Sequence, residues 1–386
     1  MPGQKLSSAD MIARLIAFDT TSRESNLALI EFVRDYLDRW RVKSELVYAP
    51  DRRKANLYAT IGPTDRGGVM LSGHSDVVPV DGQHWHSNPF KIDERDGKLY
   101  ARGSADMKSF IAVALARVPD FLAQPLATPV HLALTYDEEV GCLGVRPLIA
   151  ALATKEVKPK LCIIGEPTLM KPVIGHKGSR RLRCHVHGQE AHSSLTHQGV
   201  NAVEAAAELV TYLKGMARQR RHEGPFDHDF DPPYTTIQTG TITGGTAVNI
   251  VPRECRFDFE MRYLPQDDPN TIVDALKRFA ATLLPEMHAV SRDAGIAFEE
   301  TNAVPALSAK TQDEVVRLAL ALTGANGVGK VGFATEGGLF QQSGIPTVIC
   351  GPGSIEQAHK PDEFIAVDQV RQCEGFLDRL IDRVRQ

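Results

Sequence analysis

Several acidic residues and histidines stand directly after apolar, strand-like runs of the chain. The runs are residues 69–71, 130–134, 161–164 and 347–350, which are short and apolar on both faces, as buried sheet strands are. The loops after the strands of an open α/β sheet form its binding crevice, so residues that follow these runs are expected to converge. The residues concerned are His74, Asp76, Asp106, Glu138, Glu139, Glu166 and His359.

His74 and Asp76 stand two residues apart beyond the first run. On an extended chain, residues with this spacing project from the same face, so the Asp76 carboxylate can orient the His74 imidazole. The alternative is an ordinary histidine in a surface turn. Asp106 stands between Gly103, which permits a tight turn, and a helix expected to start near Ser109. Its alternative role is that of a helix cap.

Three adjacent acids, Asp137, Glu138 and Glu139, follow the run at residues 130–134. Adjacent carboxylates repel one another, and a nearby cation is one way to stabilise them. Neighbouring acids can also divide two tasks, since Glu139 can bind a metal while Glu138 acts as the base toward a water molecule. A solvated acidic loop is the alternative.

Glu166 and His359 follow the remaining two runs. Taken singly, each has an ordinary alternative, a capping acid and a loop histidine respectively. Taken together with His74, Asp106 and Glu139, they form the set of hard and borderline ligands that two adjacent divalent ions need. The sequence therefore predicts a site for two metal ions.

Hydrophobic periodicity indicates the elements that must carry these residues. Apolar residues recur at three- and four-residue steps in residues 8–17 and 26–40, which predicts helices, and strand-like runs then alternate with helices. This alternation predicts an α/β fold with a mixed sheet flanked by helices. The pattern resumes near the C-terminus with a helix at residues 314–322, the strand at residues 347–350 and an amphipathic helix at residues 368–384.

The pattern changes in the middle of the chain, from about Gly178. There the order is strand, helix, strand, strand, helix, strand, which is a βαββαβ unit typical of a two-layer, ferredoxin-like fold. We therefore expect a catalytic domain of residues 1–177 and 301–386, with an inserted domain of residues 178–300. The expected elements of the insertion are residues 181–187, 202–214, 236–242, 256–263, 271–284 and 296–300.

Composition excludes several classes of function. The chain has 386 residues, more than one hydrophobic core usually supports, and a formal net charge of only −4. It has no broad basic surface for nucleic acid or anionic lipid, and we expect neither as a partner. The first residues lack the apolar stretch of a signal peptide, and no run reaches the length of a membrane span. The six cysteines stand singly, so we expect a cytoplasmic protein with reduced, buried cysteines.

These residues resemble the pattern of the metal-dependent aminoacylases and carboxypeptidases of the M20 family. The shared motifs are His-x-Asp, Gly-x-Asp-Met-Lys, Asp-Glu-Glu, Gly-Glu-Pro and a late histidine, in that order over nearly the whole chain. One departure is Ser109, where the motif usually has glycine. The resemblance implies amide hydrolysis with two divalent ions, Zn²⁺ first and Co²⁺ or Mn²⁺ as alternatives, and with Glu138 as general acid and base. The implied ligands are a bridging Asp106, His74 and Glu166 on one ion, and Glu139 and His359 on the other. Two ions, three carboxylates and a bridging hydroxide would make a nearly neutral core.

The inserted domain carries three further residues that match family positions. The resemblance implies that His192, supplied by the facing subunit, stabilises the oxyanion of the intermediate. Asn249 and Arg262 would contact the substrate, because the planar fork of an arginine suits an α-carboxylate. The alternatives are a loop role or action within its own chain for His192, and a surface ion pair for Arg262. Family members pair such lid domains, and an edge strand suits that pairing, so a homodimer is expected.

Residues 334–336 and 351–363 resemble most the family members that release ornithine from N2-acetyl-L-ornithine. Desuccinylases carry Asp-Gly-Arg where this chain has Gly-Gly-Leu at residues 337–339, so the cation expected to hold a succinyl carboxylate is missing. We hypothesise that Glu336 faces the δ-ammonium of ornithine, the alternative being a hydrogen bond to the glycine loop. Acetylcitrulline, succinyl-diaminopimelate and dipeptides are alternative substrates, and a non-catalytic metal- or peptide-binding protein is the alternative class.

Overall fold

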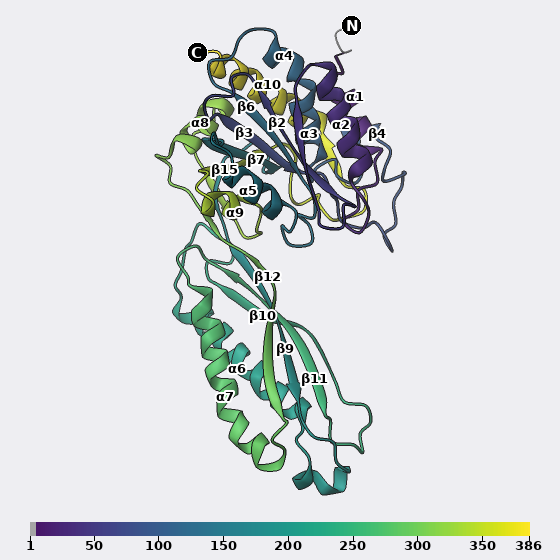
Figure 1. Ribbon diagram of the computed structural model, residues 1–386, viewed down its shortest axis with the longest axis vertical. Coiled ribbons are helices and arrows are strands. Elements are labelled where there is room, and N and C mark those ends of the chain that lie inside the picture. Colours follow the sequence, from purple (N-terminus) through teal and green to yellow (C-terminus); the bar gives the residue numbers. More distant parts are fainter. Residues whose placement is uncertain (1–4) are drawn as a thin grey trace. The chain divides into compact units, whose positions relative to one another are not determined.

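The computed structural model describes residues 5–386, which form two compact units along the chain (Figure 1). The larger unit contains residues 5–175, 307–329 and 335–386, and the smaller contains residues 176–306 and 330–334. The prediction from sequence places residues 176–177 and 301–306 in the larger domain instead, and it does the same with residues 330–334. Their position with the smaller unit follows from Lys330, whose Nζ lies 2.8 Å from Asp227 and 3.0 Å from Asp229. Among the described residues, no helix is long and apolar enough to cross a bilayer.

A mixed sheet forms the centre of the larger unit. Its strands are β1 (Ser44–Tyr48), β2 (Ala55–Ile61), β3 (Val69–His74), β6 (Val130–Thr135), β7 (Leu161–Pro167), β8 (Val173–His176), β13 (Leu307–Ser308), β14 (Gly329–Val331) and β15 (Thr347–Gly351). The order is β1-β2-β6-β3-β7-β15-β8-β13, with β14 paired to β8. The four neighbours β6, β3, β7 and β15 run parallel, and antiparallel strands flank them. Every residue of these four is buried, which explains why they read as uninterrupted apolar runs.

Helices cover both faces of this sheet, which confirms the predicted α/β arrangement (Figure 1). They are α1 (Ser8–Ile16), α2 (Leu27–Arg39), α3 (Lys108–Ala116), α4 (Val118–Leu122), α5 (Val145–Ala153), α8 (Glu314–Thr323), α9 (Gly337–Gln342) and α10 (Val367–Val384). Helix α3 is buried at every residue, because it packs between strands β3 and β7 and helices α1 and α10. Helices α1 and α10 bury one apolar face each, as their periodicity predicts.

A small antiparallel sheet joins two segments that lie far apart in the sequence. It consists of β4 (Asp93–Arg95), β5 (Lys98–Tyr100) and β16 (Phe364–Ala366), in the order β16-β5-β4. Phe364 pairs with Tyr100, and just beyond this pair the amide of Ala101 donates to the main-chain oxygen of Glu363 at 2.9 Å. The sheet therefore holds the segment before Phe364 against the segment after Tyr100.

The smaller unit is a four-stranded antiparallel sheet with two helices. Its elements are β9 (Gly178–His187), the 3-10 helix η1 (Ser193–Gln198), α6 (Ala202–Glu223), β10 (Thr236–Gly244), β11 (Glu254–Tyr263), α7 (Pro269–Val290) and β12 (Gly295–Val304). The strand order β10-β11-β9-β12 confirms the predicted βαββαβ, ferredoxin-like unit. Paired core residues such as Cys184 and Phe257 are buried with the apolar sides of α6 and α7. Helix α6 extends beyond its predicted end at Lys214, because Met216 still packs on this core.

Candidate functional site

The carboxyl ends of the parallel strands bring the predicted residues together. His74 is the last residue of β3, level with Thr135 at the end of β6, and Glu166 lies near the end of β7. Glu139 follows β6 after a short turn, and the loops before α3 and after β15 supply the remaining two residues. We call His74, Asp106, Glu139, Glu166 and His359 the five-residue cluster.

Asp106 lies between two histidines, one at each of its carboxylate oxygens. Its Oδ1 is 3.0 Å from His74 Nε2, and its Oδ2 is 3.4 Å from His359 Nε2. Glu166 lies on the His74 side, with Oε1 4.0 Å from Nε2. Glu139 lies on the His359 side, with Oε2 3.0 Å from Nε2. The side chains therefore form two groups that share Asp106, which is the division of ligands that the sequence resemblance implies.

His74 is oriented by the residue two positions further on, but through a different atom from the one expected. Its Nδ1 lies 2.9 Å from the main-chain oxygen of Asp76, whereas the Asp76 carboxylate is 3.6 Å away. A carbonyl oxygen can only accept, so Nδ1 carries a proton, and release of the second proton from Nε2, which faces Asp106, would leave a lone pair there for a metal ion. The resulting tautomer is the one that a metal ligand requires.

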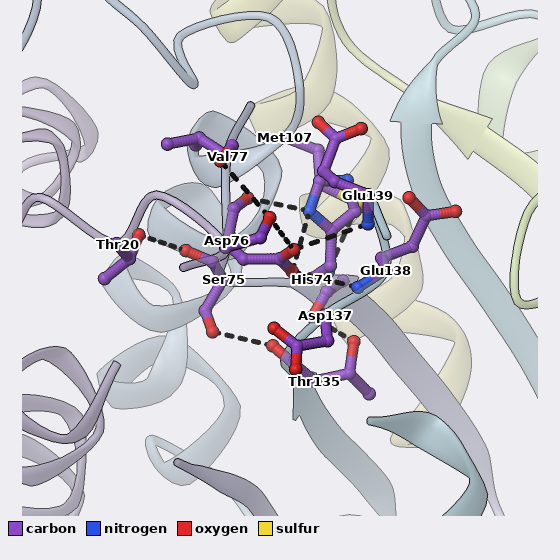
Figure 2. Close-up of polar contacts among 12 residues, drawn as sticks. Thr20, His74, Ser75, Asp76, Val77, Met107, Thr135, Asp137, Glu138 and Glu139 are labelled. Atoms are coloured by element: carbon purple, nitrogen blue, oxygen red, sulfur yellow. Dashed lines mark hydrogen bonds and ion pairs between the residues drawn. The ribbon is translucent and has the colours of Figure 1, made fainter. Parts of the chain in front are cut away.

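The carboxylate of Asp76 supports the acidic loop instead (Figure 2). Its Oδ1 accepts from the amide of Glu138 at 3.1 Å, and its Oδ2 accepts from the amide of Glu139 at 3.3 Å. The hydroxyl of Ser22 also donates to Oδ2, at 2.7 Å. These contacts explain why the Asp76 carboxylate does not reach His74, since its oxygens already accept hydrogen bonds from the backbone amides of Glu138 and Glu139.

The three adjacent acids have three different partners. Asp137 forms an ion pair with Lys54 at 2.5 Å, so the chain itself supplies the cation for this carboxylate. Glu138 Oε1 accepts from the thiol of Cys142 at 3.3 Å. Glu139 belongs to the five-residue cluster, and its side chain is only 7% exposed. The triplet is therefore not a solvated acidic loop.

Burial governs the ionisation of the glutamates. It raises the pKa of Glu138 and Glu166 well above the usual value and that of Glu139 above it, and nearby carboxylates add to the effect. In the described part of the chain, no lysine or arginine forms a salt bridge with these three side chains. Two buried cations of this region are engaged elsewhere: Lys108 donates to main-chain oxygens at the end of α1, and Arg102 pairs with Glu363. The glutamates therefore need positive charge from another source.

The two histidines respond in the opposite sense. Burial opposes a charge on His74, but its hydrogen bond to Asp106 and the surrounding carboxylates outweigh burial and raise its pKa well above the usual value. Hydrogen bonds to Asp106 and Glu139 raise the pKa of His359 to about 10. Burial likewise opposes ionisation of Asp106, yet its histidine partners lower its pKa. The site thus strongly favours positive charge next to Asp106.

The donor set fits divalent cations. One ligand atom each from His74, Asp106 and Glu139 lie within 4.8 Å of one another. Imidazole nitrogens and carboxylate oxygens are ligands that Zn²⁺, Co²⁺ and Mn²⁺ accept. Cations between these carboxylates would also relieve their repulsion, since no lysine or arginine of the described residues pairs with them. The tautomer of His74 and the two-sided contacts of Asp106 fit the same role.

Two local features fix the loops that carry the cluster. Ser109, which replaces the family glycine, is buried, and its hydroxyl donates to the main-chain oxygen of Ser104 at 2.6 Å. It therefore ties the loop before α3 to the helix. Gly165 precedes Glu166, and a Cβ at this position would lie 1.9 Å from the ring of Phe110. Only glycine allows β7 to approach α3 this closely.

The three predicted residues of the insertion all lie in the smaller unit. His192 precedes η1, where its Nδ1 accepts from the amide of Ser194 at 3.2 Å and lies 2.7 Å from the hydroxyl. Asn249 is exposed. Arg262 pairs with Glu260 at 2.9 Å on the same strand. The five-residue cluster, by contrast, belongs entirely to the larger unit.

Glu336 stands just before α9 and is only 1% exposed. Among the described residues, its Oε1 has no hydrogen-bond partner. Burial raises the pKa of this carboxyl to about 8, and the hydrogen bond to Thr135 opposes the shift. The amide of Gly337 donates to the hydroxyl of Thr335 at 3.0 Å. This donor of the glycine loop therefore has Thr335, and not Glu336, as its partner.

Sequence reasoning missed four residues that support the five-residue cluster or Glu138: Gln83, Arg102, Cys142 and Glu363. Arg102 and Glu363 form an ion pair at 2.6 Å with each side chain 1% exposed. The available signals were the charge of Arg102, directly before Gly103, and that of Glu363, four residues after His359. From the sequence alone, Cys142 is expected only as a buried apolar residue. Nothing in the sequence around Gln83 indicates its contacts.

Comparisons with known proteins agree with this description. Residues 70–383 match the profile of peptidase family M20/M25/M40. An acetylornithine deacetylase of Pasteurella multocida (strain Pm70) is 35% identical over 382 residues, which cover 96% of this chain and 96% of that protein. The crystal structure of aminopeptidase PepT from Bacillus cereus ATCC 10987 is similar with a TM-score of 0.74 at 19% identity, over 99% of this chain and 100% of that chain. A dinuclear metal-binding peptidase of the M20 family from Bacillus subtilis has a TM-score of 0.66 at 14% identity, over 98% of each chain. The two structural likenesses show a common fold.

Together, the buried ligand cluster on an α/β scaffold and these relatives define a metal-dependent amidohydrolase. The chain belongs to peptidase family M20/M25/M40.

Proposed function

We propose that this enzyme hydrolyses N2-acetyl-L-ornithine to L-ornithine and acetate, the deacetylation used in arginine biosynthesis. The observation that carries the reaction class is the position of Asp106 between His74 and His359, with Glu138 on the adjoining loop. The substrate is supported by the acetylornithine deacetylase of Pasteurella multocida, which aligns with 96% of the chain. The absence of a basic residue from 337–339 argues against a succinyl group.

Two divalent ions would act as Lewis acids in this reaction. Zn²⁺ suits the ligands first, and Co²⁺ or Mn²⁺ suit them as alternatives. When bound, such ions lower the pKa of water and polarise an amide carbonyl. The residues that would hold them are His74, Glu166 and Asp106 for one ion, and Glu139, His359 and Asp106 for the other.

Glu138 moves the proton in this proposal. The thiol of Cys142 donates to its Oε1, which fixes one of its two oxygens. As the oxygen of water bonds to the acyl carbon, Glu138 accepts the proton of that water. It then donates the proton to the nitrogen as the C–N bond breaks, so that acetate and the free amine leave. Burial raises the pKa of Glu138, which brings both transfers toward neutral pH.

Four further residues would bind the rest of the substrate. His192 would donate a hydrogen bond to the oxyanion, a role that its exposed position permits either within the chain or across a dimer. Asn249 and Arg262 would bind the amino-acid part, with the guanidinium on the α-carboxylate. The buried carboxyl of Glu336, with its unpaired Oε1, would accept a hydrogen bond from the δ-ammonium. Asp76 would keep Glu138 in place through the backbone.

A homodimer is part of the proposal. Strand β10 is at one end of the smaller sheet, and in the described part of the chain no strand pairs with its outer edge. Ile242 on this strand is 52% exposed, and Val248 just beyond it is fully exposed. Unpaired edges with exposed apolar side chains favour pairing with a second copy. The six free, buried cysteines support a cytoplasmic location.

A substrate panel tests the proposal. The purified enzyme, loaded with Zn²⁺ or Co²⁺, is assayed with acetylornithine, acetylcitrulline, succinyl-diaminopimelate and a dipeptide. We expect the highest kcat/KM with acetylornithine. A preparation that releases no ornithine from it would overturn the substrate assignment, and a metal-loaded protein that hydrolyses nothing in the panel would indicate a binding function instead.

A further inference from the structure

Gln83 makes three hydrogen bonds to three different parts of the larger unit. Its Nε2 donates to the main-chain oxygen of His359 at 3.0 Å. Its Oε1 accepts from Arg102 NH2 at 2.8 Å and from the indole of Trp85 at 3.1 Å. One amide side chain therefore connects its own loop, the segment before Asp106 and the loop that carries His359.

The amide of Gln83 matches the donor or acceptor character of all three partners. The main-chain oxygen of His359 can only accept, while the guanidinium of Arg102 and the indole of Trp85 can only donate. The side chain at position 83 must therefore present a donor on one side and an acceptor on the other. These partners also fix which end of the Gln83 amide is nitrogen, since the reversed amide would oppose like groups at all three contacts. A glutamate keeps the acceptor and loses the donor, with almost no change in size.

His359 depends on such support more than any other member of the five-residue cluster. Its side chain is 52% exposed, whereas those of the other four are at most 7% exposed. Its backbone also lies in the left-handed region, with φ of 65°, which is uncommon outside glycine. A ligand that neighbouring side chains do not pack in place must be positioned through its backbone.

The same network reaches the shared aspartate. Arg102 NH1 lies 2.6 Å from Glu363 Oε2, and Glu363 Oε1 accepts from the amides of Ala105 at 2.8 Å and Asp106 at 3.1 Å. Arg102 and Glu363 follow and precede the small sheet of β5 and β16, which brings their segments together. Glu363 thus holds the backbone of Asp106, while Gln83 is the arm of this network that reaches His359.

We propose that Gln83 is a positioning residue for His359, and that it sets the affinity of the one ion that His359 would bind. The inference rests on the proposed two-ion site and adds an asymmetry to it. Loss of the Gln83 donor should weaken the binding of the ion that His359 holds and leave the affinity for the other ion unchanged. The reason is that, among the described residues, His74 and Glu166 have no contact with Gln83. Partners of metal ligands typically contribute about 10- to 100-fold in affinity.

The test compares metal binding by Gln83→Glu, Gln83→Ala and the wild-type enzyme. Each full-length protein is stripped of metal and titrated with Zn²⁺ against a chromophoric chelator, which yields the dissociation constants of both ions without any assay of activity. We expect the wild type to bind two ions. In both variants, one dissociation constant should rise about 10- to 100-fold while the other stays unchanged. Gln83→Ala introduces no charge, so it serves if Gln83→Glu does not fold.

Gln341→Glu is the matched control. Gln341 also bridges a donor and an acceptor. Its Oε1 accepts from the amide of Ser308 at 3.0 Å, and its Nε2 donates to the main-chain oxygen of Ser308 at 2.7 Å. It makes no contact with the cluster in the described structure, so both ions should bind as in the wild type. His359→Ala identifies the affected ion, and adding Gln83→Glu to it should weaken that ion no further.

Two results would overturn the inference while the proposed function stands: a Gln83→Glu variant with both affinities intact, or one that weakens the two ions equally. A wild-type enzyme that binds no divalent ion would instead overturn the two-ion site and this inference with it.

Discussion

The carboxylate of Asp76 accepts hydrogen bonds from the backbone of the acidic loop, beginning with the amide of Glu138 at 3.1 Å. The amide of Glu139 and the hydroxyl of Ser22 complete its contacts. The buried carboxylate of Asp76 therefore positions the backbone of Glu138 and Glu139. The main-chain oxygen of Asp76 orients His74. This arrangement makes Asp76 a structural link between the proposed base and the proposed metal ligands.

Replacement of Asp76 by asparagine should lower kcat about 10- to 100-fold. The amide group of asparagine would face the amide of Glu139 or Glu138, which leaves a buried donor without an acceptor. Ser22→Ala is the control, because it removes one donor to the same carboxylate and leaves both backbone contacts. Steady-state kinetics and metal content are measured together. Equal kcat for Asp76→Asn and the wild type would contradict the role.

Replacement of Glu138 by glutamine should lower kcat by about 10²- to 10⁴-fold, the range of a lost general acid and base. Glutamine keeps the size of the side chain but cannot accept and return a proton. Metal content should stay at the wild-type value, since Glu138 lies outside the five-residue cluster. Activity and metal analysis of the same preparation provide the check, and full turnover would remove Glu138 from the mechanism.

Replacement of Glu336 by glutamine should lower kcat/KM for acetylornithine about 10- to 100-fold, the cost of losing a charge-assisted hydrogen bond of about 1.5–3 kcal/mol. An N-acetyl amino acid with an uncharged side chain is the control substrate, and its kcat/KM should not change. An unchanged value for acetylornithine would show that Glu336 does not bind the ammonium. Equal losses for both substrates would indicate a structural role.

The stability of the larger unit should fall in mild acid because of His131. Burial lowers the pKa of this histidine from 6.5 to about 4, and its Nε2 has no partner in the described structure. The folded pKa is below the unfolded one, so the stabilisation is complete above pH 6.5 and is lost as the pH falls toward 4. Between pH 7 and pH 5 the loss should be about 2 kcal/mol.

Urea unfolding of wild type and His131→Gln at these two pH values measures this effect. Both tryptophans, Trp40 and Trp85, lie in the larger unit, so their fluorescence reports on it. The pH dependence of the free energy of unfolding should be smaller in His131→Gln by this amount. His84→Gln, at an exposed histidine, should keep the wild-type dependence. The prediction fails if the two variants behave alike.

Replacement of Ile242 by lysine should weaken the proposed dimer. A charge on the outer edge of β10 opposes strand pairing. Burial of one isoleucine side chain in the dimer contributes about 1.5–3 kcal/mol, and its loss corresponds to about a 10- to 100-fold higher dissociation constant. Val290→Lys, at a 42% exposed valine at the end of α7, is the control and should leave the dimer intact. Sedimentation equilibrium gives both dissociation constants. A dimer that is insensitive to Ile242→Lys must use another surface.

Much of the fold followed from local patterns in the sequence. The fully buried strands β3, β6, β7 and β15 are apolar on both faces because helices cover the sheet, and this leaves a signal in any short window. The short strands β4, β5 and β16 carry no such signal. Strands β4 and β5 form a local hairpin, but β16 pairs with β5 across more than two hundred residues, so only the folded chain defines the complete sheet.

The sequence by itself determined which residue types stand at the ends of the strands, and hence the class of chemistry. The tertiary structure decided how they are held: Lys54 for Asp137, the main chain of Asp76 for His74, and Gln83 for His359. The physical reason is that Lys54 and Gln83 act across distant segments, and that the contacts of His74 and His359 use backbone oxygens. Every residue has the same backbone oxygen and amide, so such a contact leaves no mark in the sequence of either partner.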